Sequence, residues 1–406
     1  MARLLLLIPT TSYRVKDFMN AAHKSSVNVT IGSDEESVLN AFQSSGILQL
    51  KFDDLNESIE KIKTFHKSYP INSIIGVEEQ TCFLAVKALG QLGLPHNSIG
   101  SIKASINKYL FRNTLKKNGL PNPNFQCLKP NHDIRTLANS TDYPCVLKPV
   151  NRSASQGVIR ANDPREFVAA YQRIASLVSG EDIIVEDFLP GQEVALEGLL
   201  TDGELKTLAI FDKPEPLDGP YFEETIYVTP SQHPIVIQDR LHQIVQQAAN
   251  ALGLTEGPVH AELRIRDQES TVNEQGPWLI ELAARSIGGL CSRSLMFEGG
   301  RSLEELIISH ALKEPIGCVN REKLASGVMM IPIPKAGILK SVEGEIDARA
   351  LKHVKDLQIS IKIGQKLTPL PEGKQYLGFI FAKAESPLEV QASLRAAHSR
   401  LRFKID

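Results

Sequence analysis

Two glutamates, Glu262 and Glu281, are the residues whose type and spacing most directly suggest chemistry. They lie in two apolar segments, 259–265 (VHAELRI) and 278–283 (WLIELA), which are typical of neighbouring β-strands joined by a polar loop. Because side chains alternate along a strand, both carboxylates are expected on one polar face of this strand pair. Carboxylates within apolar strands are unfavourable unless a positive charge compensates them.

Two kinds of positive charge would compensate this pair. Arg264 and Arg285 lie close by in the sequence and give a purely structural explanation. A hard divalent cation bound by carboxylate oxygens gives a functional one, most naturally Mg²⁺ shared with nucleotide phosphates. Other segments of the chain bear on this choice.

A lysine followed by a small polar turn is the second candidate feature. Lys148 lies in an apolar segment, 144–150 (PCVLKPV), and residues 151–157 (NRSASQG) follow it. Such a turn offers hydroxyls and backbone N–H groups to phosphate oxygens, although an ordinary hairpin turn has the same composition. The sequence contains neither a GxGxxG after its first strand nor a GxxxxGK[ST], so neither common nucleotide fingerprint applies.

Aromatic and acidic residues follow two further strands. Segment 182–188 (DIIVEDF) leads into Leu189 and Pro190, which predicts an apolar wall for an adenine ring, with Glu193 placed for ribose hydroxyls. Solvated carboxylates beside a turn are the alternative. Residues 219–230 (GPYFEETIYVTP) are interpreted either as a wall of an amino-acid pocket or as an exposed connector.

The order of apolar and helical segments predicts an α/β protein. Strands at 3–8, 27–31, 46–50 and 72–77 alternate with helices at 55–67 and 78–91, which is typical of a parallel sheet. One helical connector is expected over 100–119, and the glycine-rich turns after about 322 indicate a β-rich unit. We therefore predict domains at 1–98, 99–320 (with a lid subdomain at about 140–195) and 321–406.

Composition excludes several classes of protein. The 406 residues carry a net charge of −2, which gives no electrostatic footprint for nucleic acid or for an acidic membrane. The five cysteines lack metal-ligand spacing and indicate reduced thiols, hence a cytoplasmic protein. The N-terminal apolar run is shorter than the ~7–15 residues of a secretion signal, and no segment approaches the ~20 apolar residues of a membrane span.

Several motifs occur in an order that resembles the ATP-grasp superfamily of carboxylate–amine ligases. They are the NK pair ending at Lys108 before a GLP turn, LKP with its Ser/Gly turn, VEDFLPGQE, and AEL followed by IELAAR. The resemblance covers about residues 1–320. The segment beginning VMMIPIPKAGILKSVEG resembles the terminal domain of the L-amino-acid ligase branch, which includes dipeptide-forming enzymes.

The resemblance implies a nucleotide site that uses ATP with Mg²⁺, or with Mn²⁺ in its place. Lys108 and Lys148 would contact the phosphates, and Glu262 and Glu281 would bind two metal ions. Arg285 would steady the transferring group. The remaining cofactor-binding residues would be the lid residues Ser153, Ser155 and Gly157, then Glu186, Phe188 and Leu189 at adenine, and Glu193 at ribose.

One departure from the family pattern concerns the metal. The superfamily often has Asn two positions after the second carboxylate, where this chain has Ala283. The departure implies altered coordination of one metal ion. It is also the only support for a nucleotide-binding regulatory protein with a vestigial site.

The resemblance implies an ADP-forming ligase that activates a small carboxylate, an amino acid, as an acyl phosphate and joins it to an amine. Its partners would be these small molecules, with no nucleic acid or membrane, and the resemblance is compatible with a homodimer. A biotin-carboxylase-like enzyme that activates bicarbonate is the alternative within enzymes.

Overall fold

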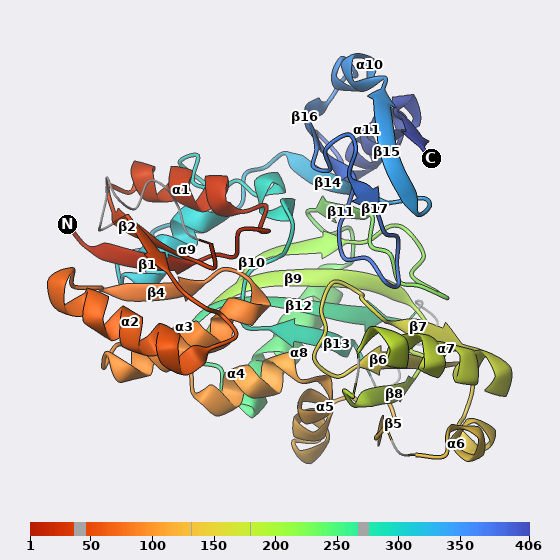
Figure 1. The fold of residues 1–406 in the computed structure, drawn as a ribbon. Coiled ribbons are helices and arrows are strands. Elements are labelled where there is room, and N and C mark those ends of the chain that lie inside the picture. The colour runs from red at the N-terminus through yellow and green to blue at the C-terminus, as the bar shows by residue number, and fades with distance from the viewer. Residues whose placement is uncertain (36–45, 131, 179, 267–275) are drawn as a thin grey trace.

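The N-terminal part of the computed structural model is a parallel sheet with helices, as the sequence predicts. The structure describes residues 1–35, 46–130, 132–178, 180–266 and 276–406 (Figure 1). The sheet has the order β3-β2-β1-β4, and the buried leucines of β1 lie at its centre. Its elements are β1 (Arg3–Leu7), α1 (Val15–Lys24), β2 (Asn28–Ser33), β3 (Ile47–Gln49), α2 (Leu55–Ser68), β4 (Ser73–Gly76) and α3 (Glu79–Gln91).

The connector over 100–119 is helical, as predicted, and it forms two helices. They are α4 (Ile99–Ile106) and α5 (Lys108–Lys117). Asn107 separates them because its backbone is extended and its side chain accepts the N–H of Leu110 at 2.9 Å, which caps α5. Lys108 is therefore the first residue of a new helix, and its N–H donates to the carbonyl of Val150 at 3.0 Å.

A small antiparallel sheet contains most of the segment predicted as a lid subdomain, and the lid stays a prediction. Its strand order is β5-β8-β6-β7, and α6 and α7 belong to the same body, with Phe167 and Ile174 of α7 in its core. In Figure 1 this body lies at the lower right, apart from the N-terminal sheet. Its elements are β5 (Phe125–Leu128), α6 (Ile134–Ser140), β6 (Cys145–Pro149), β7 (Ile159–Ala161), α7 (Pro164–Leu177) and β8 (Ile183–Asp187).

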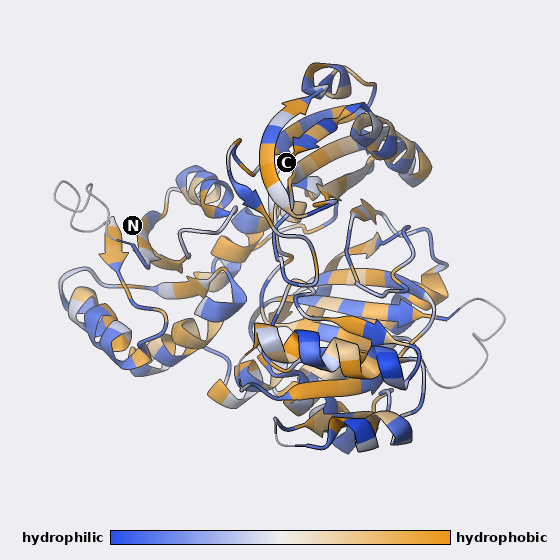
Figure 2. Ribbon diagram, turned by 45° about the vertical axis from the view of Figure 1, so that its right-hand side comes forward, coloured by the Kyte–Doolittle hydropathy of each residue, from blue (hydrophilic) through white to orange (hydrophobic). Residues whose placement is uncertain are grey.

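An eight-stranded sheet with the order β13-β12-β9-β10-β11-β14-β18-β16 forms the centre of the molecule. Figure 2 shows hydrophobic residues along these strands, and α8 packs its buried face against β10 and β13. The first elements of this part are β9 (Gln192–Thr201), β10 (Glu204–Asp212), β11 (Ile226–Thr229), α8 (Ile235–Leu252), β12 (Gly257–Ile265), β13 (Trp278–Ala283) and α9 (Leu303–Ala311). No helix of the described residues is long and apolar enough to cross a bilayer.

The last section shares this sheet. Strand β14 pairs with both β11 and β18, so the sheet continues across the predicted boundary near residue 320, which stays a prediction. A three-stranded sheet of order β17-β15-β19 completes the section. Its elements are β14 (Ala325–Ile331), β15 (Gly337–Glu343), α10 (Glu345–Arg349), β16 (Val354–Ile359), β17 (Lys366–Leu367), β18 (Gly378–Ala384), α11 (Pro387–Arg400) and β19 (Arg402–Ile405).

Candidate active site

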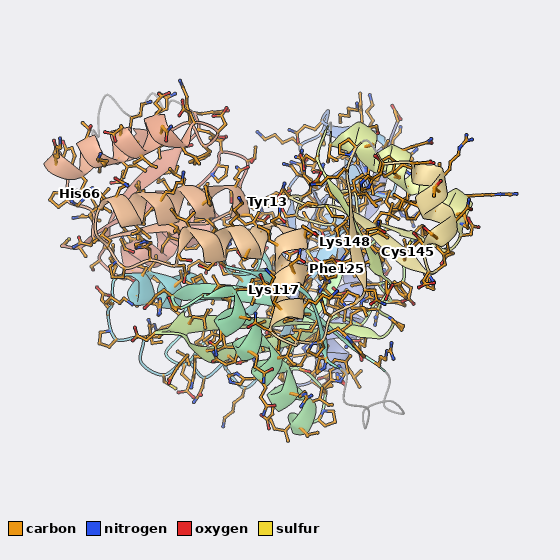
Figure 3. The ribbon with its side chains drawn as sticks, turned by 90° about the horizontal axis from the view of Figure 1, so that it is seen from below. Tyr13, His66, Lys117, Phe125, Cys145 and Lys148 are labelled. Carbon is orange, nitrogen blue, oxygen red and sulfur yellow. The ribbon has the colours of Figure 1, made fainter. Side chains whose placement is uncertain are left out.

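A cleft of about 690 Å³ is lined by residues from the N-terminal part, the lid, the central sheet and the last section. Tyr13 from the N-terminal part and Lys148 from the lid sheet both lie toward the middle of the molecule (Figure 3). All predicted site residues except Gly157 line this cleft. The structure thus brings together residues that are separated by almost two hundred positions in the sequence.

Lys148 is buried beside a carboxylate at one wall of the cleft. Its Nζ lies 2.7 Å from Oε2 of Glu186, whose Oε1 also accepts Nε of Arg112 at 2.8 Å. Burial alone would raise the pKa of Glu186, but Arg112 and Lys148 together lower it to about 2. The carboxylate of Glu186 therefore binds Lys148 and Arg112, and its predicted place at adenine stays a prediction.

Lys108 and the 151–157 turn lie together beside Lys148. The Nζ of Lys108 donates to the carbonyl of Arg152, and the Asn107 amide donates to Oδ1 of Asn151 at 2.9 Å. Ser153 and Ser155 line the cleft as predicted. These contacts place a lysine and two hydroxyls where they would surround a polyanionic ligand.

Gly157 has a different part from the one predicted. It lies outside the cleft lining, and its N–H donates to the carbonyl of Pro371 at 2.9 Å. Its φ is +71°, and a Cβ there would come within 2.8 Å of Cγ of Pro149. Gly157 is needed for the conformation of the turn, because other residues rarely adopt this φ and a Cβ would meet Pro149. Its N–H is already occupied and is not directed at a phosphate.

We expect the 151–157 turn to exchange its amide hydrogens rapidly without nucleotide and to become protected when nucleotide binds. Its side chains are exposed or half-buried, and individual hydrogen bonds hold it, such as those from Gln156 Nε2 to the carbonyl of Glu372 at 2.8 Å and from the N–H of Gly157 to the carbonyl of Pro371 at 2.9 Å. Hydrogen exchange with and without an ATP analogue and Mg²⁺ measures this, with peptides of β9 as the unchanging control. Equal protection of the turn in both states would contradict a lid.

An aromatic wall follows strand β8, as predicted. Phe188 and Leu189 line the cleft with Phe222, whose ring centroid lies 6.4 Å from that of Phe188. Gly191 allows this turn to approach β12, since a Cβ on it would lie 2.2 Å from the carbonyl oxygen of Ile265. This wall has the apolar surface that a nucleobase would need.

Glu262 and Glu281 are cross-strand partners in the pairing of β12 with β13, so the predicted pair is present. Arg264 and Arg285, the two arginines of the purely structural explanation, do not both bind this pair of glutamates. Arg264 binds Glu193 at 3.1 Å and does not contact Glu262. Lys213 does, with its Nζ 3.1 Å from Oε1 of Glu262.

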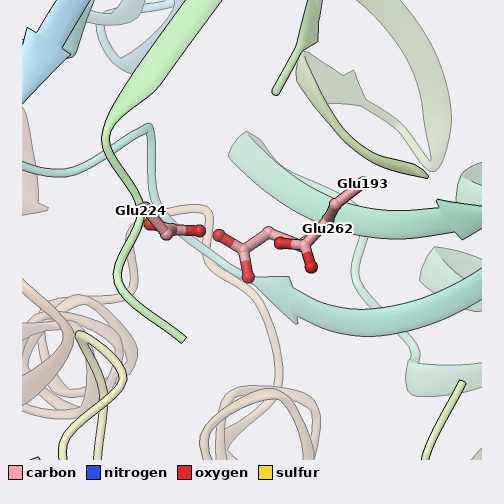
Figure 4. Close-up of side chains that lie close together, drawn as sticks. All are labelled: Glu193, Glu224 and Glu262. Carbon is pink, nitrogen blue, oxygen red and sulfur yellow. The ribbon is translucent and has the colours of Figure 1, made fainter. Parts of the chain in front are cut away.

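Lys213 is almost fully buried among three carboxylates. Its Nζ lies 2.7 Å from Oε1 of Glu193 and also contacts Glu224 and Glu262; Figure 4 shows the three glutamates together. Burial would lower the pKa of Lys213, but these carboxylates raise it well above its usual value. Burial and the charge of Glu262 raise the pKa of Glu224 above its usual value.

The same contacts give Glu193 two cationic partners. Its carboxylate is bound by Lys213 and Arg264, and its predicted place at the ribose stays a prediction. Lys213 itself was not predicted. A single lysine after an apolar strand is usually solvated, and the sequence gives no signal for the three carboxylates that converge on it.

The donor set at the paired carboxylates fits a hard divalent cation. Glu262 and Glu281 face each other and line the cleft, and carboxylate oxygens are the ligands that Mg²⁺ prefers. Glu193, Glu224 and Glu262 also form a group whose oxygens lie within 4.8 Å of one another, but the ammonium of Lys213 already serves it. Ala283 is buried opposite His260 and supplies no ligand atom.

Arg285 lies beside a further carboxylate that sequence reasoning missed. Its Nη2 is 3.7 Å from Oε2 of Glu79, in the first turn of α3, and Glu79 lines the cleft. Burial and the charge of Glu281 raise the pKa of Glu79. Arg285 lines the cleft, and among the described residues its buried Nε has no hydrogen-bond partner. Cys291 is buried with its pKa raised to about 12, which fits the packed side chain that was predicted.

The family comparisons agree with this geometry. Residues 141–294 match the model described as ATP-grasp domain, and residues 329–406 match L-amino acid ligase C-terminal domain 2. The chain contains an ATP-grasp domain. The predicted resemblance and fold class are thereby confirmed, and the ATP-grasp domain includes the lid strand β6 and both paired carboxylates.

Relatives and solved structures are similar at low identity. An uncharacterised protein of Sinorhizobium fredii is 22% identical over 100% of this chain and 84% of its own length. A D-alanine–D-alanine ligase of Ralstonia pickettii is 26% identical over 53% of this chain and 64% of its own. Alanine–anticapsin ligase of Bacillus subtilis is 24% identical over 57% of this chain and 52% of its own.

The aligned part thus spans about half to two thirds of those ligases' length. The crystal structure of an L-amino acid ligase from Bacillus licheniformis matches with a TM-score of 0.82 and 24% identity, over 100% of this chain and 99% of that one. This likeness establishes a shared fold across the whole chain.

Proposed function

We propose that the protein is an ATP-dependent, ADP-forming ligase that joins an amino-acid carboxylate to an amine. The observation that carries the proposal is the cleft itself, where Lys108 meets Lys148, the Glu262–Glu281 pair and Arg285, the last four of which belong to the ATP-grasp domain. The relatives named as D-alanine–D-alanine ligase and alanine–anticapsin ligase support amino acids as the substrate class.

The residues of the cleft suit the two steps of such a reaction. A carboxylate is a poor electrophile until a phosphoryl group converts it to an acyl phosphate, which an amine then attacks as phosphate leaves. Lys108 and Lys148 would bind and orient the transferring phosphate, and phosphoryl transfer needs this positioning and charge neutralisation above all. The 151–157 turn would exclude water from the acyl phosphate.

The paired carboxylates would hold the metal. Glu262 and Glu281 fit Mg²⁺ or Mn²⁺, which when bound neutralises charge on the phosphates. Arg285, which lines the cleft, would contact the oxygens of the reacting group through its guanidinium. Glu79, a carboxylate in the same part of the cleft, would suit the ammonium group of an amino acid.

Phosphate release from ATP, screened over pairs of amino acids, tests the proposal. We expect release that depends on at least one amino-acid pair and on Mg²⁺, together with a condensed product of matching mass. Release that requires bicarbonate and biotin would favour the carboxylase alternative. Nucleotide binding without release for any pair would favour a regulatory protein with a vestigial site.

The proposal extends to location and assembly. We propose a cytoplasmic protein, supported by cysteines of which Cys82, Cys145 and Cys291 are buried as free thiols.

We also propose a homodimer. Light scattering at two protein concentrations tests this state, and a monomer mass at both would overturn it.

A further inference from the structure

Arg112 is an almost fully buried arginine of α5 that joins the lid to the central sheet. On the lid side its Nε and Nη2 donate to the two carboxylate oxygens of Glu186 at 2.8 and 3.1 Å. On the sheet side its Nη1 donates to the carbonyl of Leu279 at 2.6 Å, and Nη2 to that of Ile280 at 3.3 Å. Arg112 does not line the cleft, so a ligand there would not touch it.

The charges around Arg112 form a small closed group. Arg112 and Lys148 are cations, and both bind Glu186, whose Oε2 accepts from Lys148 at 2.7 Å and from Arg112 at 3.1 Å. All three side chains are buried, so water screens their interactions little. Two positive charges and one negative charge leave a formal charge of +1, and of the two cations only Lys148 lines the cleft.

We propose that Arg112 is a positioning residue that neutralises Glu186 and thereby leaves the charge of Lys148 available to the nucleotide phosphates. Without the guanidinium, Glu186 and Lys148 would form an isolated buried ion pair with no net charge. The carboxylate would then hold the ammonium against itself, since neither group has another partner of opposite charge in this triad. The inference rests on the proposed function only in requiring that the cleft binds ATP.

The geometry explains why an arginine occupies this position. A planar fork reaches both oxygens of Glu186 and two backbone carbonyls at once, whereas a lysine ammonium presents a single point charge. Leu279 and Ile280 immediately precede Glu281, so the same guanidinium also fixes the strand that carries a proposed metal ligand. Asn122, in the segment between α5 and β5, receives a further contact from Nη1 at 3.4 Å.

Binding of ATP and of adenosine to a set of variants, measured by calorimetry, tests the inference. We expect Arg112→Met to weaken ATP binding by about tenfold or more, as for loss of a charge-assisted contact, and to change adenosine affinity much less. The double variant Arg112→Met/Glu186→Gln again has one uncompensated lysine, so it should recover most of the lost ATP affinity. Arg135→Met removes an equal charge from the exposed surface of α6 and should leave both affinities unchanged.

These outcomes distinguish an electrostatic role of Arg112 from a purely structural role. Equal losses of ATP and adenosine affinity in Arg112→Met, without recovery in the double variant, would overturn the inference. A wild-type protein that does not bind ATP would instead refute the proposed function. Thermal unfolding checks the fold of each variant. If Arg112→Met does not fold, Glu186→Gln decides: unchanged or tighter ATP binding supports the role of charge, and a tenfold loss relative to adenosine contradicts it.

Discussion

Glu281→Gln and Glu262→Gln should each reduce phosphate release by on the order of a hundredfold or more while leaving the protein folded. The two carboxylates are direct partners across β12 and β13 and face the cleft, where nucleotide phosphates would bring further negative charge. Replacing one carboxylate by a neutral amide of the same shape removes a metal ligand without creating a cavity. Steady-state phosphate release, with circular dichroism for the fold, measures this effect.

Both variants should remain folded and should respond less to Mg²⁺ than the wild type does. Glu262 also binds Lys213, which keeps Glu193 and Glu224 as partners in Glu262→Gln, so we expect that variant to remain folded. Titration with Mg²⁺ should show weaker dependence on the metal in both variants. Glu204→Gln, in an exposed position at the start of β10, is the matched control and should behave as wild type. Near-wild-type turnover in either glutamate variant would refute the metal assignment.

The sequence predicts this pair because a simple periodicity places it. Alternation along 259–265 and 278–283 puts both carboxylates on one face, and the structure confirms that they oppose each other. The lysine before the polar turn and the aromatic wall at Phe188 were predictable for the same reason. In each case the informative residues are neighbours in the chain, and local geometry fixes where they point.

The partners of these residues could not be predicted, because they come from distant parts of the chain. Lys213 reaches Glu262 from 49 positions away, and Arg112 reaches Glu186 from 74. Nothing local distinguishes either cation from a solvated surface residue. Glu79 was not predicted for the same reason, since it lies in an ordinary first helical turn and becomes part of the cleft only in the folded chain.

The same limit applies to the roles predicted for Glu186 and Glu193, because their cationic partners also come from distant parts of the chain. Glu186 and Glu193 were placed at adenine and ribose from their position in VEDFLPGQE, and both side chains do line the cleft. Their carboxylates, however, are bound by buried cations at 2.7–3.1 Å. A buried carboxylate is stable only with such partners. A motif can place a residue in a site without revealing which group its charge serves.

Arg285→Lys should lose more than about tenfold in turnover, roughly 1.4 kcal/mol of transition-state stabilisation, with little change in ATP affinity. Arg285 lies beyond the straight run of β13, and its Nη2 is 3.7 Å from the carboxylate of Glu79, too long for a strong hydrogen bond. Its Nη1 donates to the carbonyl of Ser286, and among the described residues its buried Nε has no partner. A guanidinium held in this way can present two donors to oxygens of an acyl phosphate, which a lysine cannot reproduce.

The alternative is that Arg285 only neutralises its acidic neighbours. Burial would lower the pKa of Arg285, but Glu79 and Glu281 raise it, so the arginine does carry such a compensating charge. In that case lysine should substitute tolerably, and any loss should appear as weaker binding of Mg²⁺. Titrations of nucleotide and Mg²⁺, beside the turnover number, distinguish the two cases, with Arg240→Lys on the exposed face of α8 as the control. A turnover loss below about tenfold would leave Arg285 as a compensating charge, because a group that contacts the reacting oxygens should cost at least that much when its geometry is lost.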